Sequence, residues 1–317
     1  MTAPAKHAVL LLAHGTPASV DDVPEFLLRV TGGRVLPQEA IEEVKHRYAA
    51  IGRSPLTELT LKQGELLAER MGLPVYVGMR NWHPLVSQAL AAIEADGVRH
   101  AVVICLAPHN SRTSVGLYRK SLADAAASDI TFDFVESWHD HPLLVQAFAE
   151  KLIAARKRNN GERGGEPAGE TQASIRVIFT AHSVPERTVR EGDPYELQAR
   201  ETAALVASSA GLEESEWRFA FQSQGMSGGP WLGPTVEETI LEMKRAGDRS
   251  ILIQPIGFLS DHVEVLYDID IHFKQFAKSH GIGLLRTESL NDSTLLISAL
   301  HEIVESRMSA SASVGRQ

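Results

Sequence analysis

A stripe of ionisable side chains in one predicted helix is the strongest chemical signal in the sequence. Glu264, Asp268 and His272 are spaced four residues apart in the segment 261–274, which begins with an N-cap-like Ser-Asp pair. In an α-helix this spacing places three side chains on one face. Most other positions are apolar, which predicts a largely buried helix. Each of the three groups can accept a proton or hold a divalent ion, so the stripe favours a cation path over a solvated acidic face.

A repeated motif singles out two of the thirteen histidines. Residues 7–17 and 175–185 both combine an apolar run with the pattern Ala-His-small-x-Pro, which gives His14 and His182 equivalent positions. A lone histidine is usually structural or solvated, but a place at the end of a strand within a repeat favours a functional role. A neutral imidazole can accept a proton or ligate a divalent metal near physiological pH.

The elements around these residues predict an α/β fold with parallel sheets. Short apolar runs alternate with longer amphipathic stretches, as in βα units whose strands are covered on both faces. The predicted strands are Ala8–Ala13, Val75–Gly78, Ala101–Ala107, Ile130–Glu136, Ile175–Ala181 and Ser250–Ile256. The predicted helices include Leu56–Met71, Pro84–Ala95, Pro142–Lys157, Tyr195–Ser209 and Thr235–Ala246.

The repeat further predicts two Rossmann-like lobes that form one functional unit. The N-terminal lobe spans 7–156 and the C-terminal lobe spans 175–308, joined by a linker loop at 157–174 that is rich in Asn, Gly and Pro. The small, polar residues 309–317 suggest a frayed tail.

Parallel α/β sheets bind ligands beyond the carboxyl ends of their strands. His14, His109, His182 and His262 fall at such ends, so the active site is expected in a cleft between the lobes. Neither a P-loop nor a dinucleotide-binding glycine motif follows a strand, so nucleotide binding has no support.

Composition narrows the classes of function. The chain has 317 residues, 44% of them hydrophobic, and a formal net charge of −9, which argues against a nucleic-acid partner. No apolar run approaches the roughly 20 residues that span a bilayer, and no secretory signal is apparent. A cytoplasmic location without a transmembrane segment is therefore expected.

The single cysteine, Cys105, lies in an apolar run, which favours a buried, inert thiol. It excludes an internal disulfide and a cysteine-ligated iron–sulfur cluster. A metal would then be held by His, Asp, Glu or Tyr, which suits a labile divalent ion better than a sequestered one. We expect no permanently bound cofactor.

Several motifs resemble those of the ferrochelatase family, in the same order along the chain. The resemblance covers about residues 7–305 and is strongest to the compact bacterial coproporphyrin ferrochelatases. It implies a two-lobed, chelatase-like fold and a lyase that inserts Fe(II), its substrate, into a porphyrin. The motifs are Tyr48–Gly52, Ser54–Leu56, Ala107–His109, Phe179–Glu186, Gly192–Tyr195, Trp231–Pro234 and Gly257–Asp268.

The resemblance also implies roles for the residues of the stripe. His182 and Glu264 would face the porphyrin centre and share metal coordination and removal of the pyrrole protons, with the division between them left open. Asp268 would continue the path of metal or protons, whereas the family usually has a glutamate where this chain has His272. At His14 the Gram-positive-type relatives usually have a tyrosine that contacts the iron from the opposite face. His14 could ligate the iron there or merely line the cleft.

The polar and positively charged residues that could contact propionates indicate which porphyrin the chain binds. By this resemblance, four residues match propionate-contacting positions of the coproporphyrin enzymes: Arg34, Arg47, Ser54 and Tyr118. Such groups suit carboxylates, although each alone has an ordinary explanation as a surface polar residue. Together they favour coproporphyrin III, converted to coproheme in haem biosynthesis, over protoporphyrin IX, converted to protohaem.

Other classes remain open on sequence grounds. They are a cobalt or nickel chelatase of the same fold, a non-catalytic tetrapyrrole or metal carrier, and a periplasmic-type binding protein, which the missing export signal disfavours. The stripe disfavours a passive haem carrier, which needs only one or two axial ligands. We expect a monomer with transient contacts to other enzymes of the haem pathway.

Overall fold

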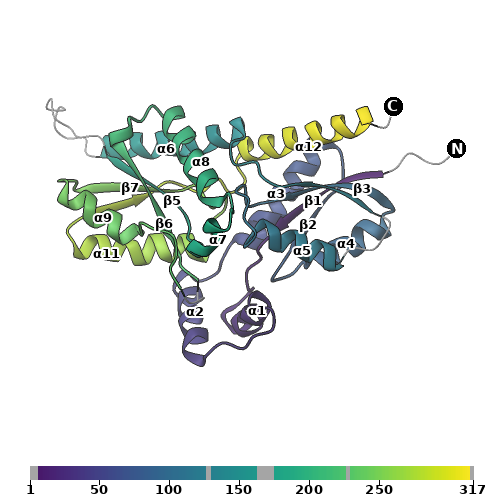
Figure 1. The fold of residues 1–317 in the computed structure, drawn as a ribbon, viewed down its shortest axis with the longest axis horizontal. Helices are drawn as coiled ribbons and strands as arrows, with labels where there is room; N and C mark the ends of the chain where they lie inside the picture. Colours follow the sequence, from purple (N-terminus) through teal and green to yellow (C-terminus); the bar gives the residue numbers. More distant parts are fainter. Residues whose placement is uncertain (1–5, 126–129, 163–174, 226–228, 315–317) are drawn as a thin grey trace. The chain divides into compact units, whose positions relative to one another are not determined.

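The computed structural model describes residues 6–125, 130–162, 175–225 and 229–314 (Figure 1). Contacts between Cα atoms group the chain into two compact units. Unit 1 comprises Met1–Trp138, Ser260–His262 and Asn291–Gln317, and unit 2 comprises His139–Leu259 and Val263–Leu290.

The sheet of unit 1 consists of four parallel strands in the order β2-β1-β3-β4. They are β1 (Lys6–Ala13), β2 (Val75–Met79), β3 (Val98–Cys105) and β4 (Thr131–Val135). The central strands are almost continuously buried, because helices cover both faces of the sheet.

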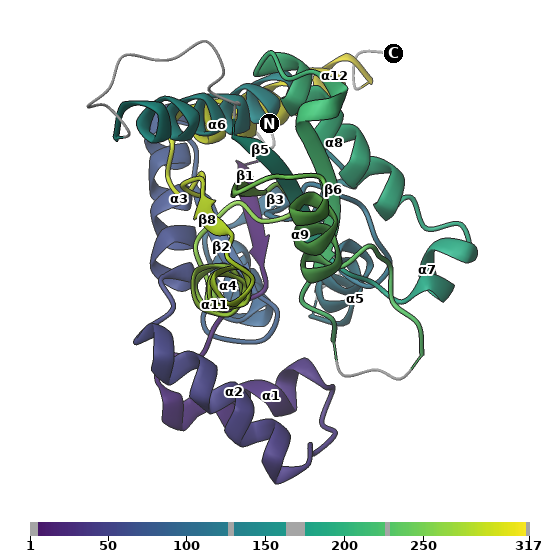
Figure 2. The ribbon, with the colours of Figure 1, turned by 90° about the vertical axis from the view of Figure 1, so that its left-hand side faces the viewer.

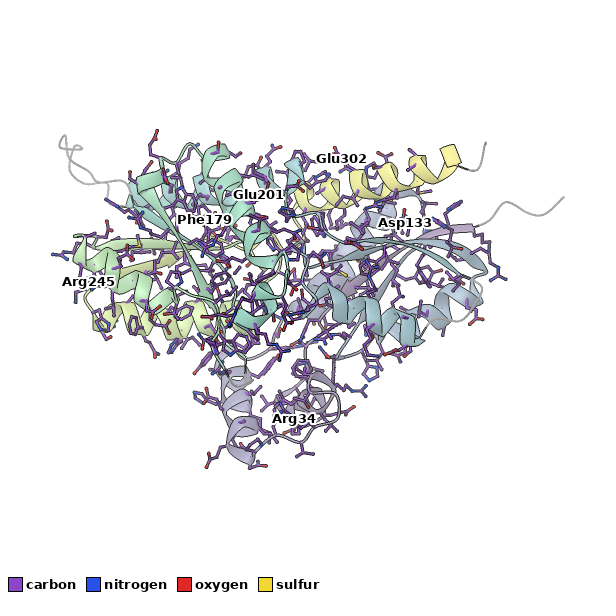
Figure 3. The ribbon with its side chains drawn as sticks, viewed as in Figure 1. Arg34, Asp133, Phe179, Glu201, Arg245 and Glu302 are labelled. Carbon is purple, nitrogen blue, oxygen red and sulfur yellow. The ribbon has the colours of Figure 1, made fainter. Side chains whose placement is uncertain are left out.

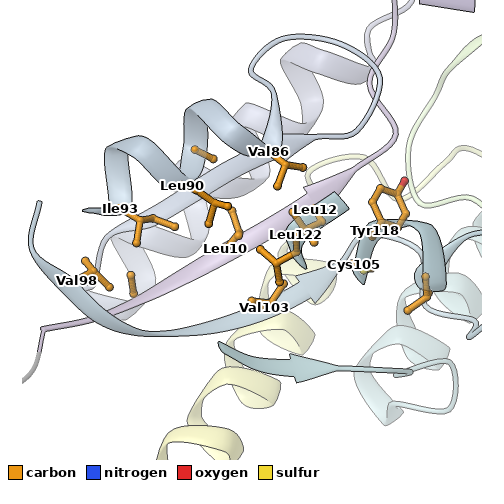
Figure 4. Close-up of a cluster of buried hydrophobic side chains, with 13 residues drawn as sticks. Leu10, Leu12, Val86, Leu90, Ile93, Val98, Val103, Cys105, Tyr118 and Leu122 are labelled. Carbon is orange, nitrogen blue, oxygen red and sulfur yellow. The ribbon is translucent and has the colours of Figure 1, made fainter. Parts of the chain in front are cut away.

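Two helices, α4 (Val86–Ala95) and α5 (Val115–Ala125), cover one face and share a core with β1 and β3. Figure 4 shows this core, including Leu10, Leu90 and Leu122, with the Tyr118 ring at its edge. On the other side, α12 (Thr294–Val314) packs on α3 (Leu56–Met71) and contacts β3. The core therefore joins segments from the two ends of the chain.

A small helical subdomain follows β1. It consists of η1 (Val20–Asp22), α1 (Val23–Val30) and α2 (Gln38–Ile51), which contact one another and project from the sheet of unit 1 (Figure 2). Phe26 of α1 lies between two aromatic rings, 6.3 Å from that of Tyr48 and 6.4 Å from that of Trp82.

Unit 2 repeats the topology of unit 1. Its parallel strands have the order β6-β5-β7-β8, so the first strand of each unit is central and pairs with the second and third. They are β5 (Arg176–His182), β6 (Trp217–Gln222), β7 (Ser250–Pro255) and β8 (Gly283–Arg286). The predicted duplicated α/β fold with parallel sheets is confirmed.

Helices also cover both faces of the second sheet. The helices α6 (Pro142–Glu162) and α8 (Tyr195–Ser209) pack on each other, whereas α9 (Val236–Arg245) and α11 (Lys274–Ser279) share a core with the strands. The remaining elements are α7 (Glu186–Arg190), η2 (Glu214–Glu216), α10 (Val263–Leu266) and a π-helical turn, η3 (Asp268–Phe273).

The boundaries of the units differ from the linear ones expected from the sequence. Helix α6, expected in the first lobe, lies in unit 2, and the segment from residue 291 onward, expected in the second lobe, lies in unit 1. Of the expected linker 157–174, residues 157–162 belong to α6, and residues 163–174 lie outside the described residues. The expected frayed tail is helical as far as Val314. Within the described residues, no helix is long and apolar enough to cross a membrane.

Candidate active site

The site in unit 2 begins where β5 and β7 end side by side. His182 is the last residue of β5, and the chain after β7 turns sharply across it at Gly257. A Cβ atom at Gly257 would lie 2.9 Å from the Cα of Ala181, so only glycine permits this approach. The next residue, Phe258, then places its ring 6.4 Å from the imidazole of His182.

His182 and Glu264 face each other at this strand end. The Nε2 atom of His182 lies 3.5 Å from Oε1 of Glu264, and about a third of each side chain is exposed, 31% and 34%. The Nδ1 atom of His182 hydrogen-bonds to the carbonyl oxygen of Ser183. Because a carbonyl can only accept, Nδ1 carries a proton, and Nε2 is the nitrogen directed at the carboxylate.

The environment of His182 favours its protonated form. Burial alone would lower the pKa of His182, but the charge and hydrogen bonding of Glu264, the Ser183 carbonyl and the charge of Asp268 outweigh it. The net effect is a raised pKa. The histidine–carboxylate pair therefore readily takes up a proton, and His182 becomes a metal ligand only when Nε2 has lost it.

The spacing of the pair also suits a divalent ion. Two ligands about 2.1 Å from a tetrahedrally coordinated divalent ion lie about 3.4 Å apart, close to the separation of Nε2 and Oε1. Among the described residues, no group of three His, Cys, Asp or Glu side chains is arranged to hold a metal. Two protein ligands with further positions left to other donors form the kind of site from which an ion can be passed on.

Gln222, the last residue of β6, holds the backbone around the pair. Its Nε2 donates to the carbonyl of Glu264 at 3.0 Å, and its Oε1 accepts from the hydroxyl of Thr180 at 2.6 Å. Its own carbonyl accepts from the amide of Ser183 at 2.7 Å. One buried side chain thus connects the ends of β5 and β6 to α10.

Asp268 is held separately. It is buried, and its Oδ2 accepts a hydrogen bond from the hydroxyl of Ser223. Ser223 has a φ of +58°, which is uncommon for a residue other than glycine. Of the residues that the sequence singled out, the structure therefore pairs His182 with Glu264, and the charge of Asp268 acts on His182.

His272 does not join them. The amide of His272 bonds to the carbonyl of Tyr267 at 2.9 Å, five residues back, as in a π-helix. Because a π turn contains more residues than an α turn, a residue four positions after Asp268 no longer lies above it. The imidazole instead lies 3.2 Å from Oε1 of Glu237 on α9, and 55% of it is exposed. The prediction of one continuous stripe is therefore wrong at His272.

Aromatic side chains enclose the His182 imidazole. The ring of Trp231 lies 6.5 Å from it, and Tyr195 donates its hydroxyl to the backbone carbonyl of His182 at 2.9 Å. Burial raises the pKa of Tyr195, and the charges of Glu264 and Asp193 add to this effect. Tyr195 therefore remains a neutral donor that fixes the end of β5.

His14 occupies the matching position in unit 1. It follows β1 directly, is exposed, and its Nδ1 lies 3.0 Å from the carbonyl oxygen of Gly15. By the same reasoning as for His182, Nδ1 is protonated and Nε2 is the ligand-capable nitrogen. The imidazole packs edge-on to Phe26 with 5.8 Å between ring centroids. Gly15 has a φ of +84°, which glycine adopts without strain.

The four predicted propionate-binding residues differ in their surroundings. Arg34 is exposed on the connection between α1 and α2 (Figure 3), and Arg47 donates to Glu43 on its own helix at 3.0 Å. Ser54 is buried, and its hydroxyl has no hydrogen-bond partner. Tyr118 is buried, which raises its pKa and keeps the phenol protonated.

The two other histidines expected at strand ends belong to unit 1. His109 is buried after β3. His262 lies 2.9 Å from the carbonyl oxygen of Ser260 through Nδ1, and it groups with unit 1 although it follows β7.

Gln222 and Ser223 are residues of the site that the sequence analysis did not identify. Gln222 ends β6 and Ser223 follows it, and the mixed sequence of this strand, Trp-Arg-Phe-Ala-Phe-Gln, lacks the continuous apolar run by which six other strands were predicted. The π turn also has no composition signal in the segment 267–273.

Two solved chelatase structures share this fold. SirB from Bacillus subtilis with Fe³⁺ matches with a TM-score of 0.56 at 12% identity, covering 95% of this chain and 94% of that chain. CbiX, described as the terminal enzyme of sirohaem biosynthesis in denitrifying bacteria, matches with a TM-score of 0.51 at 14% identity, covering 94% and 98%. The fold is therefore that of the two-lobed chelatases.

Sequence comparison identifies the family within this class. The ferrochelatase family model matches residues 6–308. A ferrochelatase of Acidobacterium capsulatum is 50% identical over 314 residues, with 94% of each chain covered. A coproporphyrin III ferrochelatase of Geobacillus kaustophilus is 35% identical over 311 residues, covering 94% of this chain and 95% of the relative. The chain belongs to the ferrochelatase family and is a metal chelatase, a lyase with iron and a porphyrin as its substrates.

Proposed function

We propose that this chain inserts Fe(II) into coproporphyrin III and thereby forms coproheme for haem biosynthesis. The observation that carries the proposal is the supply of uncommitted hydrogen-bond donors in unit 1. The hydroxyl of Ser54 is buried without a partner, and the guanidinium of Arg34 forms no ion pair with the described residues. A porphyrin with four propionates offers such donors more acceptors than a porphyrin with two.

The relatives agree with this proposal without deciding it. Coproporphyrin III ferrochelatases of Geobacillus kaustophilus and Geobacillus thermodenitrificans are both 35% identical to this chain. The Acidobacterium capsulatum protein, at 50%, is named ferrochelatase with no porphyrin specified.

The proposed chemistry assigns distinct tasks to the residues of unit 2. Fe(II) binds between His182 Nε2 and Glu264 after losing water, and the two groups then accept the protons that leave the pyrrole nitrogens. Asp268, which is buried and whose charge acts on His182, supplies negative charge along the route of the metal or protons. The raised pKa of His182 makes it a competent proton acceptor, and its neighbouring carboxylate stabilises the imidazolium that results.

The test compares two porphyrins under anaerobic conditions in the same detergent. We expect kcat/KM for Fe(II) insertion to be roughly 5- to 150-fold higher with coproporphyrin III than with protoporphyrin IX, because the latter leaves buried donors unpaired. Ser54→Ala removes one such donor and should bring the kcat/KM values for the two porphyrins closer together.

Three outcomes would contradict the proposal. Equal specificity constants would favour protoporphyrin IX, converted to protohaem, as an equally good substrate. Metalloporphyrin that never exceeds the enzyme concentration would indicate a carrier instead of an enzyme. Insertion of cobalt or nickel in preference to iron would indicate a different chelatase.

A further inference from the structure

Arg80 is a cation in unit 1 that the proposed chemistry leaves unused. It follows β2 directly, and its amide donates to the carbonyl of Ala13 at 3.0 Å, while the amide of Asn81 donates to the carbonyl of His14 at 3.0 Å. These bonds fix the backbone of residues 80–81 beside the end of β1. Arg80 therefore lies at the carboxyl edge of the sheet, where parallel α/β folds bind ligands.

The guanidinium of Arg80 lacks a counter-charge. Its Nε atom is buried without a hydrogen-bond partner, and it forms no ion pair within the described residues. The guanidinium lies over the ring of Tyr118, with 5.7 Å between the Cζ atom and the ring centroid. Burial lowers the pKa of Arg80, which reflects the cost of keeping this charge out of water.

A comparison within the chain shows that this arrangement is unusual. Arg286 in unit 2 is also largely buried, but its guanidinium makes hydrogen bonds to both carboxylate oxygens of Asp270, the shortest 2.8 Å. Buried charges are normally paired in this way, because an uncompensated one costs stability. The guanidinium of Arg80 is also largely buried, but no carboxylate of the described residues pairs with it. We therefore expect a bound ligand to supply the missing negative charge.

The surroundings indicate the chemistry of that ligand. Tyr118 contributes a phenol that its raised pKa keeps protonated, and Figure 4 shows its hydroxyl directed away from the apolar core. The side-chain nitrogen Nδ2 of Asn81 is a further buried donor without a hydrogen-bond partner. A cation accompanied by donors suits an anion with two acceptor oxygens, and a guanidinium binds a carboxylate through two parallel hydrogen bonds.

We propose that Arg80, together with Tyr118, forms a carboxylate-binding subsite for one acidic side chain of the tetrapyrrole substrate. The inference rests on the proposed function, since a porphyrin carboxylate is the anion that this function supplies. It adds to the four predicted propionate-binding residues an arginine that no sequence motif singled out. The counter-charge then arrives with the substrate, so the subsite favours the bound state over the empty one.

Porphyrin binding without metal tests the subsite apart from the insertion chemistry. We expect Arg80→Gln to weaken binding of coproporphyrin III roughly 10- to 100-fold, as the loss of a charge-assisted hydrogen-bond pair predicts. Arg80→Lys keeps the positive charge but cannot form two parallel hydrogen bonds to one carboxylate, so it should bind coproporphyrin III with intermediate affinity. Arg53→Gln is the matched control, because Arg53 is an exposed arginine of the same unit that already pairs with Glu58 at 2.7 Å.

The thermal stability of the unliganded protein provides a second readout. Because Arg80→Gln removes an uncompensated buried charge, the melting temperature of the empty variant should equal or exceed that of the wild type. A structural role for Arg80 predicts the opposite, a lower melting temperature with unchanged porphyrin affinity.

The outcomes separate this inference from the proposed function. Equal coproporphyrin affinities for wild type and Arg80→Gln, or a variant that is destabilised or fails to fold, would overturn the subsite. Iron insertion by the wild type with those same results would leave the proposed function standing. A wild type that neither binds nor metallates coproporphyrin III would overturn both.

Discussion

His182 and Glu264 are coupled by their short separation, and the charge of Glu264 raises the pKa of His182. Nε2 of His182 lies only 3.5 Å from the Glu264 carboxylate. The carboxylate can therefore stabilise a proton on the imidazole or share a metal ion with it. We therefore expect His182→Ala and Glu264→Gln each to lower kcat for iron insertion at least about 100-fold, the usual range for losing a proton-transfer group. Steady-state insertion rates measure the loss.

Circular dichroism of both variants is the control, since each side chain is about one-third exposed and neither is part of the apolar core. Near-wild-type turnover by a folded His182→Ala protein would show that the metal and protons take another route.

The same pair predicts a change in titration. Since the folded state raises the pKa of His182, its protonation stabilises the fold below the ordinary histidine pKa, and this stabilisation disappears as pH rises through the folded value. Glu264→Gln removes the main group that raises the pKa and leaves the burial that lowers it. We expect the His182 pKa in this variant to fall, as measured by NMR of the imidazole. An unchanged or higher value would mean that Glu264 does not control the proton on His182.

His14 gives the corresponding prediction for unit 1. Its Nδ1 is engaged by the carbonyl of Gly15, so Nε2 is the nitrogen that can reach iron. If His14 ligates the product, His14→Ala should change the absorption and resonance Raman signature of bound ferric coproporphyrin and loosen its binding. Metal insertion should remain appreciable. Identical spectra and affinities for wild type and variant would leave His14 as a residue that lines the site.

At the scale of elements, the π turn sets the geometry of the site. An uninterrupted α-helix from residue 261 would have placed Glu264, Asp268 and His272 on one face. Because of the π turn, His272 instead contacts Glu237. Asp270, in the middle of this turn, is anchored by hydrogen bonds from Arg286 at the end of β8. The exposed fractions of these two side chains are only 12% for Arg286 and 25% for Asp270. The anchor therefore fixes the turn that carries Asp268.

We predict that Asp270→Asn lowers the free energy of unfolding by about 1–3 kcal/mol, because Arg286 loses its charged acceptor. The displaced turn should also raise the KM for Fe(II) more than it lowers kcat. Glu237→Gln is the matched control, because the exposed His272–Glu237 pair is worth no more than about 1 kcal/mol. Asp270→Glu should restore part of the loss. Equal effects of the Asp270 and Glu237 variants on KM would remove Asp270 from the positioning of the site.

Element prediction from the sequence succeeded for most strands and for several helices. Six strands, including β1 and β5, were located from continuous apolar runs, and the limits of α3 and α8 were predicted correctly. The sequence missed β6 and β8, since β6 begins with Trp-Arg and β8 has only four residues. The π turn was missed because its own segment carries no distinguishing pattern, and one of its partners, Arg286, is distant in sequence.

At the scale of the whole molecule, each half of the chain contributes one helix to the unit formed mainly by the other half. Helix α6 leaves the first half to pack on α8 in unit 2, and α12 returns from the second half to pack on α3 in unit 1. A repeat in sequence predicts two similar sheets, but it carries no information on which sheet a terminal helix covers. That choice depends on complementary apolar faces, so the lobes could be predicted and their boundaries could not.

The last prediction concerns how acid affects unit 1. His7 on β1 and His100 on β3 are paired in register, with 5.2 Å between ring centroids, at the end of the sheet opposite His14. The Nδ1 atom of His7 and the Nε2 atom of His100 are buried without hydrogen-bond partners. Burial lowers the pKa of His100 and the neighbouring His7 adds to this, while Asp133, itself bonded to Arg307 at 3.3 Å, acts in the opposite direction.

Because the folded pKa of His100 is depressed, the unfolded chain takes up this proton first as pH falls. Unit 1 should therefore lose stability as pH drops through the ordinary histidine pKa of about 6.5 and continue to lose it down to the folded value. Hydrogen exchange of the β1 and β3 amides at pH 7.5 and 5.5 measures this loss. His100→Gln should make the difference between the two pH values smaller, whatever it does to stability at pH 7.5. His83→Gln, at an exposed histidine of the same unit, should leave the difference unchanged. An equal pH dependence in wild type and His100→Gln would assign the acid sensitivity of unit 1 to other groups.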